Sequence, residues 1–307
     1  MILVHNNRPS LRANVLVGHG WLFPGHHSIV DCGSGLQSST ILEPRIVDSG
    51  QEDLKLNLMK LTALIEVFSK KGTKDLNLRN KLKGQIEWLP DSVGKLSSLS
   101  TLDLSENHLI ALPSAISGLS SLTKLDLHAN KIIELPRSFG YLLSLVYLNL
   151  SANQLTTFPA SLCRLVHLQE LDLSSNNLSV LPESIGSLKK LKELDLSFNE
   201  LESVPESLCY ATTLVKINIS NNFADLRSLP RSIGNLENLE ELDISNNQIR
   251  VVPDSFMRLS KLQVLKTEGN PLEIPPRYVL DDGTRAVVLF MKLQYMRGEE
   301  ASVKRKK

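Results

Sequence analysis

Leucines recur along the middle of the chain at a constant spacing. Leu99 and Leu122 lie 23 residues apart, and the same interval continues as far as Leu214. The full set of anchor positions is Leu99, Leu122, Leu145, Leu168, Leu191, Leu214, Leu239 and Leu262. Self-similarity at a fixed period of this length is the sequence signature of a repeat architecture, in which each unit stacks on its neighbours.

Each unit follows the pattern L-x-x-L-x-L-x-x-N-x-L and then L-P, as in "LSTLDLSENHLIALPSAISGL" at residues 99–119. Alternating apolar and polar positions predict a short strand whose leucines point inward. This pattern is that of a leucine-rich repeat, whose units bury a common core that no single unit could form alone. We therefore predict an α/β fold, a leucine-rich repeat solenoid with a curved parallel sheet on its concave side and helical caps at both ends.

The repeat pattern divides the chain into four segments. Residues 73–275 are predicted to hold one degenerate and eight regular repeats. Residues 53–72 carry apolar side chains at helical spacing and predict an N-terminal capping helix, and residues 276–307 predict a C-terminal capping helix with a basic tail. Residues 1–52 fit no repeat, and we expect an irregular, disordered segment there.

The asparagine and proline columns of the pattern are predicted to be structural. The asparagine of each repeat is expected to bond backbone groups where the chain leaves the strand, because a buried amide is tolerated only when it is hydrogen-bonded. The proline of each repeat restricts φ and is expected to begin the return segment. Neither column is assigned a role in chemistry.

One unit breaks the period, because 25 residues separate Leu214 from Leu239. The extra residues fall within "NNFADLRSLP" at residues 221–230, between the strand and the return segment. Loops tolerate added length at small entropic cost, so we interpret this stretch as a loop irregularity. Phe223 and Arg227 are secondary contact candidates.

Composition excludes several classes of protein. A net charge of +1 gives no reason to expect nucleic-acid or membrane binding, and no apolar run is long enough for a transmembrane helix. Three cysteines do not make a disulfide framework, and Cys163 and Cys209 are expected to lie too far apart to pair. We expect a cytoplasmic monomer. The basic tail leaves a nuclear address open, and the acid-poor N-terminus leaves a transit peptide open.

No motif for catalysis is present: the chain lacks a P-loop, a dinucleotide fingerprint, a nucleophile elbow and the kinase motifs. His19, His26, His27 and Cys32 match no known zinc spacing. We therefore predict no catalytic residue, no metal site and no cofactor.

The outward-facing strand positions are the candidate binding surface, because solenoids use such extended faces for binding. The column at the middle of the strand forms an acidic ladder, and the aromatic departures from the pattern resemble the side chains enriched at binding hot spots. The predicted protein-binding residues are Lys124, Asp126, His128, Tyr147, Glu170, Asp172, Glu193, Asp195, Phe198, Lys216, Glu241 and Asp243.

The entry "KKGTKDLNLRNKL", the irregular unit "INISNNFADLRSLPRSIGNL" and the exit "EGNPLEIPP" resemble the plant intracellular Ras-group-related leucine-rich repeat proteins. The resemblance extends over about residues 53–297. It implies a non-enzymatic protein that mediates protein interactions in signal transduction, with a small GTPase or its regulator as partner. This functional inference is an analogy of fold.

We expect an interaction scaffold or adaptor that presents its concave strands to a protein partner. Two other functions stay open at this point. One is a targeting subunit that brings a phosphatase or a small-GTPase regulator to its target. The other is the sensor fragment of a larger receptor or immune protein.

Overall fold

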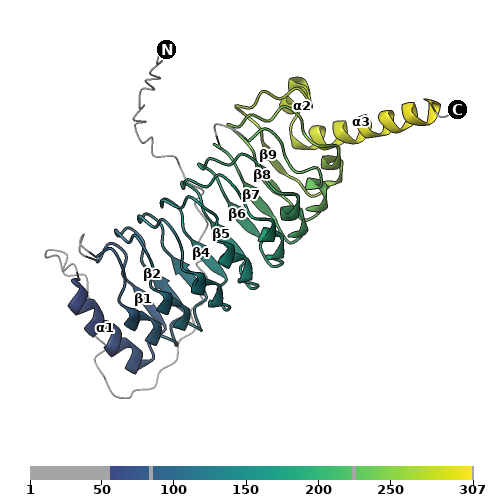
Figure 1. Ribbon diagram of the computed structural model, residues 1–307. Coiled ribbons are helices and arrows are strands. Elements are labelled where there is room, and N and C mark those ends of the chain that lie inside the picture. Colours follow the sequence, from purple (N-terminus) through teal and green to yellow (C-terminus); the bar gives the residue numbers. More distant parts are fainter. Residues whose placement is uncertain (1–55, 83–85, 223–225, 306–307) are drawn as a thin grey trace, which may run out of the picture. The chain divides into compact units, whose positions relative to one another are not determined.

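A computed structural model describes residues 56–82, 86–222 and 226–305, which belong to the compact unit Glu52–Lys307 (Figure 1). The expectations for residues 1–52, including the histidines near the N-terminus, lie outside the described residues, as does the contact proposed for Phe223.

Within the described residues, nine short strands form one sheet whose strand order follows the chain. Each strand pairs in parallel with the next, and equivalent residues lie opposite each other, such as Leu102 and Leu125. The strands are β1 (Asp75–Asn77), β2 (Thr101–Asp103), β3 (Lys124–Asp126), β4 (Tyr147–Asn149), β5 (Glu170–Asp172), β6 (Glu193–Asp195), β7 (Lys216–Asn218), β8 (Glu241–Asp243) and β9 (Val264–Lys266).

Short 3₁₀ helices line the side of the solenoid opposite the sheet (Figure 1). They are η1 (Asp91–Lys95), η2 (Ser114–Gly118), η3 (Arg137–Tyr141), η4 (Ala160–Arg164), η5 (Glu183–Ser187), η6 (Glu206–Tyr210), η7 (Ile233–Asn235) and η8 (Asp254–Arg258). A proline precedes most of them, as Pro113 with φ −69° precedes η2. Because strands stack about 4.8 Å apart and helices need more room, the sheet side is the shorter, concave side.

The core is a continuous stack of leucines, isoleucines and valines from successive repeats. The asparagine column closes it at the end of the strands. Asn130 shows the arrangement: its Oδ1 accepts from Leu109 N at 3.0 Å, and its Nδ2 donates to Leu104 O and Leu127 O, both at 3.0 Å. Each asparagine thus joins two repeats, and the predicted structural role of this column is confirmed.

Helices lie at both ends of the described residues. Helix α1 (Leu58–Lys71) begins at Asn57, whose side chain accepts from Lys60 N, and ends at Gly72 in the left-handed conformation (φ 62°). Glycine takes this conformation without steric cost, which is why the helix ends there. Helices α2 (Arg277–Asp281) and α3 (Thr284–Arg305) follow β9.

The predicted fold class is therefore confirmed: the described residues form a leucine-rich repeat solenoid with a parallel sheet. Cys163 and Cys209 are both free, in agreement with the prediction that they lie too far apart to pair, and both are buried. None of the helices within the described ranges has the length and apolar character needed to cross a bilayer.

The irregular repeat departs from its neighbours on the return side. Helix η7 is shorter than the other 3₁₀ helices of the described residues. The residue before it is Ser232, where the other repeats have a proline. The carboxylate of Glu206, from the preceding repeat, accepts from Arg231 N at 2.6 Å and from Ser232 N at 3.0 Å. These bonds give the backbone N–H groups of Arg231 and Ser232, which belong to the altered loop, a hydrogen-bond acceptor.

Candidate binding surface on the sheet

The twelve predicted binding residues all lie on or directly after strands β3 to β8. Six are the first residues of their strands: Lys124, Tyr147, Glu170, Glu193, Lys216 and Glu241. Four are the third residues, Asp126, Asp172, Asp195 and Asp243, while His128 and Phe198 follow strands β3 and β6. The strand register aligns the first and third residues in two continuous rows. We call the surface that these twelve residues form the sheet face.

The carboxylates of the acidic row also stabilise the turn after each strand. Asp172 Oδ1 accepts from Ser174 N at 2.9 Å, and Asp195 Oδ1 accepts from Ser197 N at the same distance. This is the bond that Asp and Asn characteristically make two residues along the chain. The repeat pattern predicted this row only as a recognition surface, and its role in the turns follows from the structure.

Asp172 and Asp195 are the most perturbed carboxyls of the row. Burial, followed by the charge of Asp195, raises the pKa of Asp172 from 3.8 to about 6. Burial also raises the pKa of Asp195, whose Oδ2 accepts from Asn218 Nδ2 at 2.9 Å. The centre of the sheet face therefore concentrates negative charge that water solvates poorly.

Cations lie at both ends of this acidic centre. Lys124 Nζ lies 4.7 Å from the centre of the Tyr147 ring, a cation–π distance. On the other side, Lys216 pairs with Glu241 at 3.2 Å and Lys266 pairs with Asp243 Oδ2 at 3.2 Å. The two ion pairs offset the charges of Glu241 and Asp243 on strand β8.

The two aromatic candidates differ in exposure. Tyr147 is half-buried, and burial is the main cause that raises the pKa of its phenol to about 12. Phe198 is 45% exposed and has φ 53°. A bulky residue in this left-handed region is strained, so Phe198 is the more unusual of the two.

A charged cluster lies at the N-terminal end of the described sheet, and it joins the predicted residues Asp126 and His128 to Arg79 and Glu106, which the repeat pattern did not predict. Arg79 Nη2 donates to Glu106 Oε1, which also lies 3.7 Å from His128 Nε2. His128 Nδ1 lies 2.9 Å from Asp126 Oδ1, and this hydrogen bond is the main cause that raises the pKa of the imidazole. Arg79 and His128 occupy the column that Ser105 fills in its repeat. The sequence signal for this cluster was that Arg79 and His128 replace serine in the repeats directly before and after that of Ser105.

The residues of the sheet face form an extended surface and not a compact cluster. In the part of the chain that the structure describes, no three His, Cys, Asp or Glu residues are arranged to hold a metal ion. Its charged and aromatic side chains extend over six consecutive strands, which is the geometry of an extended contact with another molecule.

The fold and this surface define a leucine-rich repeat protein. The family model described as "Leucine rich repeat" matches residues 71–132, 135–178, 167–223 and 212–272. The chain therefore belongs to the leucine-rich repeat family.

Among curated proteins, the chain is similar to Plant intracellular Ras-group-related LRR protein 4. The Arabidopsis thaliana protein is 59% identical over 73 residues, which are 22% of this chain and 13% of that protein. The Oryza sativa protein of that name is 62% identical over 63 residues, 20% of this chain and 11% of that protein. The chain thus spans less than a sixth of the length of these relatives. The resemblance stated from the sequence is confirmed for this part of the chain.

Solved structures resemble the chain over a longer stretch. A leucine-rich repeat protein of Leptospira interrogans has a TM-score of 0.59 and 30% identity, covering 74% of this chain and 62% of that chain. The plant peptide hormone receptor RGFR1, solved in complex with RGF2, has a TM-score of 0.56 and 30% identity over 68% of this chain and 38% of that chain.

Proposed function

We propose that this protein is a non-enzymatic interaction scaffold or adaptor in intracellular signal transduction, and that it binds a protein partner through the sheet face. The names of its relatives support this assignment, because they describe intracellular, Ras-group-related proteins. The observation that carries it is the row of first strand residues, which are charged or aromatic in every strand from β3 to β8, beside an acidic row that Asn149 and Asn218 interrupt.

The charge of the sheet face indicates the chemistry of the partner. Asp172 and Asp195 are held opposite each other with raised pKa values, so a lysine or arginine placed between them relieves their repulsion. The proposed partner therefore presents a basic segment next to an apolar group that reaches Phe198. A small GTPase or its regulator is the proposed class, by analogy with the relatives' names.

We assign the protein to the cytoplasm, with the nucleus as a second site, and we propose that it acts as a monomer. The alternative function, a targeting subunit for a phosphatase or GTPase regulator, would use the same surface. It differs from a general adaptor because its partner is a single enzyme bound in a fixed ratio.

A sensor role is the second candidate, and the structural neighbours favour it. RGFR1 was solved in complex with RGF2, and the receptor kinase HAESA, with a TM-score of 0.58 and 25% identity, was solved with the peptide hormone IDA. Repeats of this fold thus take a peptide ligand in those receptors. In this reading the described repeats are the ligand-binding part of a larger receptor or immune protein.

The test is proximity labelling in the native cell, followed by direct binding measurements with each purified candidate. The double variant Asp172→Asn with Asp195→Asn removes both charges and keeps the turn hydrogen bonds, since Asn149 already fills this column in β4. We expect it to weaken binding at least tenfold. Glu134→Gln with Glu183→Gln, away from the sheet, is the matched control.

The outcomes separate the candidate functions. Unchanged affinity of the sheet-face variant for every direct partner overturns the assignment. Binding that depends on the nucleotide state of a GTPase supports the proposed partner class, whereas a short secreted peptide as the direct ligand supports the sensor.

A further inference from the structure

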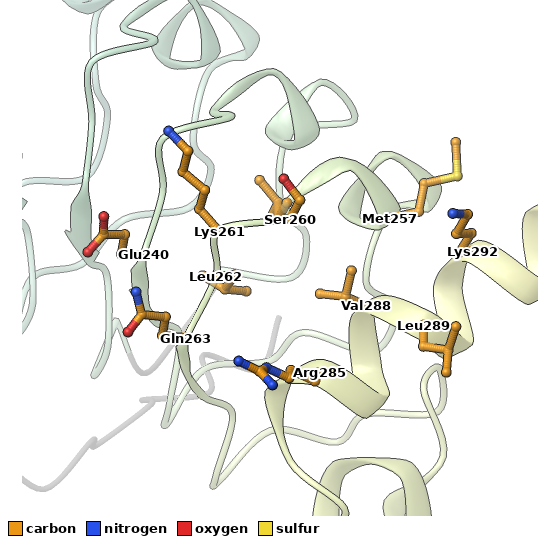
Figure 2. Close-up of a pocket in the computed structure, with 11 residues that line it drawn as sticks. Glu240, Met257, Ser260, Lys261, Leu262, Gln263, Arg285, Val288, Leu289 and Lys292 are labelled. Carbon is orange, nitrogen blue, oxygen red and sulfur yellow. The ribbon is translucent and has the colours of Figure 1, made fainter.

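A groove lies at the C-terminal end of the solenoid, between the last repeat and helix α3 (Figure 2). Its volume is about 840 Å³. Lys261 and Gln263 come from the segment that leads into β9, and Arg285, Val288 and Lys292 come from α3. The groove is separate from the sheet face, and none of the twelve residues of that surface lines it.

The base of the groove is apolar. Leu259 and Leu262 are buried beneath it, while Met257 and Val288 are partly exposed along its walls. Leu289 is 57% exposed at its edge. Burial of such side chains by a partner is favourable at about 25 cal/mol per Å² of apolar surface.

The apolar surface continues along α3 beyond the groove. Leu289, Leu293 and Met296 follow one another at intervals of four and three residues, which places them on one side of the helix. Leu293 is 47% exposed and Met296 is 51% exposed, whereas Val287 and Met291 on the other side are buried in the core. From Leu289 to Met296 the stripe runs for about 10 Å along the axis, so the whole surface is elongated.

Cations surround this apolar surface. Lys261, Arg285 and Lys292 line the groove with one carboxylate, that of Glu240. Lys261 Nζ donates to Asn238 Oδ1 at 2.7 Å, and among the described residues no carboxylate forms an ion pair with Arg285 or Lys292. The local excess of positive charge attracts an acidic ligand.

We infer that this groove and the Leu289 stripe form a second docking site, which takes an acidic amphipathic helix of a partner protein. The apolar side of that helix lies in the groove and along α3, in the helix-in-groove mode of recognition. Its carboxylates face Lys261, Arg285 and Lys292. The site goes beyond the proposed function of the sheet face and does not depend on it.

The probe that tests this site is a displayed library of 18-residue helical peptides. Leucines occupy positions i, i+3, i+4 and i+7, and Glu, Lys or Gln are drawn at random elsewhere. We expect selection on the full chain to enrich peptides with net negative charge, and we expect Leu289→Asp to weaken their binding at least tenfold. Arg285→Glu with Lys292→Glu should shift the selected peptides toward net positive charge.

Matched controls locate the effect. Leu143→Asp and Arg137→Glu alter exposed residues of the same kinds on the return side and should leave peptide binding unchanged. The Asp172→Asn, Asp195→Asn variant should also bind the peptide normally, so failure at the groove and failure at the sheet face can be told apart. Circular dichroism melts establish that each variant is folded.

Several outcomes overturn the inference. One is that no selected peptide depends on Leu289 for binding, and another is that the selected peptides are neutral or basic. Binding to phosphatidylserine vesicles that Leu289→Asp abolishes assigns the site to an anionic membrane instead. Self-association that Leu289→Asp abolishes in sedimentation assigns it to a second copy of the chain.

Discussion

Asp172 and Asp195 lie directly opposite each other on the neighbouring parallel strands β5 and β6. Both carboxylates accept a backbone hydrogen bond from the turn that follows, and both have a raised pKa, chiefly because partial burial removes water from them. The charge that the proposed recognition uses at this pair therefore lowers the stability of the fold. The turn needs the Oδ1 atom, but nothing in the fold needs the charge.

Removing the charge of Asp172 should stabilise the protein at neutral and alkaline pH. The folded state holds the proton up to a pKa of about 6, compared with an ordinary value of 3.8, so the free energy of unfolding falls as pH rises between these values. Asp172→Asn keeps the turn bond and should raise this free energy by about 1–3 kcal/mol at pH 8. Urea unfolding at pH 8 and pH 4 measures the effect.

The advantage of Asp172→Asn should shrink toward pH 4, where aspartic acid is largely protonated in the folded state. Asp254→Asn, on the exposed start of η8, is the control for removal of a carboxylate. An equal gain at both pH values would show that the charge of Asp172 is not the cause.

His128 should stabilise the folded state when it is protonated and charged, whereas Asp172 destabilises it when it is charged. Its folded pKa lies above the ordinary value of 6.5, mainly because of its hydrogen bond to Asp126, so its contribution is fully present below pH 6.5 and is lost as pH rises through the folded pKa. Desolvation opposes this rise, and Glu106 adds to it. His128→Gln should lower the free energy of unfolding by about 0.5 kcal/mol at pH 5.5.

The change caused by His128→Gln should be smaller at pH 9, where the imidazole is neutral. His108→Gln, at an exposed position after β2, is the control. NMR titration of the imidazole gives the pKa directly, and a value below 6.5 would contradict the prediction.

The asparagine column should be far more sensitive than its neighbours. Asn130→Ala leaves Leu109 N without its side-chain partner in a buried site, and Leu104 O and Leu127 O each lose one of two side-chain donors. We expect a loss of about 3 kcal/mol. Asn177→Ala changes an exposed asparagine and should cost less than about 0.5 kcal/mol. Similar losses in the two variants by urea unfolding would refute the structural assignment of the column.

The repeat pattern alone predicted most of this scaffold, because each column has one physical role that recurs in every unit. Leu102 alternates with polar neighbours and is buried, and Asn130 must bond backbone groups in any fold that buries it. The contact between Arg79 and Glu106 escaped prediction because it joins two departures from the pattern that lie in different columns and different repeats. The raised pKa of Asp172 could not be predicted either, because its causes are burial and the charge of Asp195 on the neighbouring strand.

The groove at the C-terminal end could not be predicted for a related reason. The sequence predicted a capping helix within residues 276–307 but did not show that Val287 packs inward while Leu289 stays exposed. Lys261 reaches the groove from another element of the chain. Only the packing of α3 against the last repeat brings these residues together.

Phe198 should separate binding from stability, and it gives the sharpest test of the sheet face. Its φ of 53° is one that Asn adopts more readily, and Asn221 and Asn246 hold the same conformation in the next two repeats. In Phe198→Asn, relief of about 1 kcal/mol of backbone strain offsets the lost apolar contacts, so the thermal midpoint should stay within a few degrees. Loss of the exposed ring should weaken partner binding at least tenfold. The control is Ser175→Asn, which makes the matching change in the repeat before that of Phe198 and should alter neither binding nor the thermal midpoint. A large fall in the thermal midpoint of Phe198→Asn would instead show that Phe198 is a packing residue.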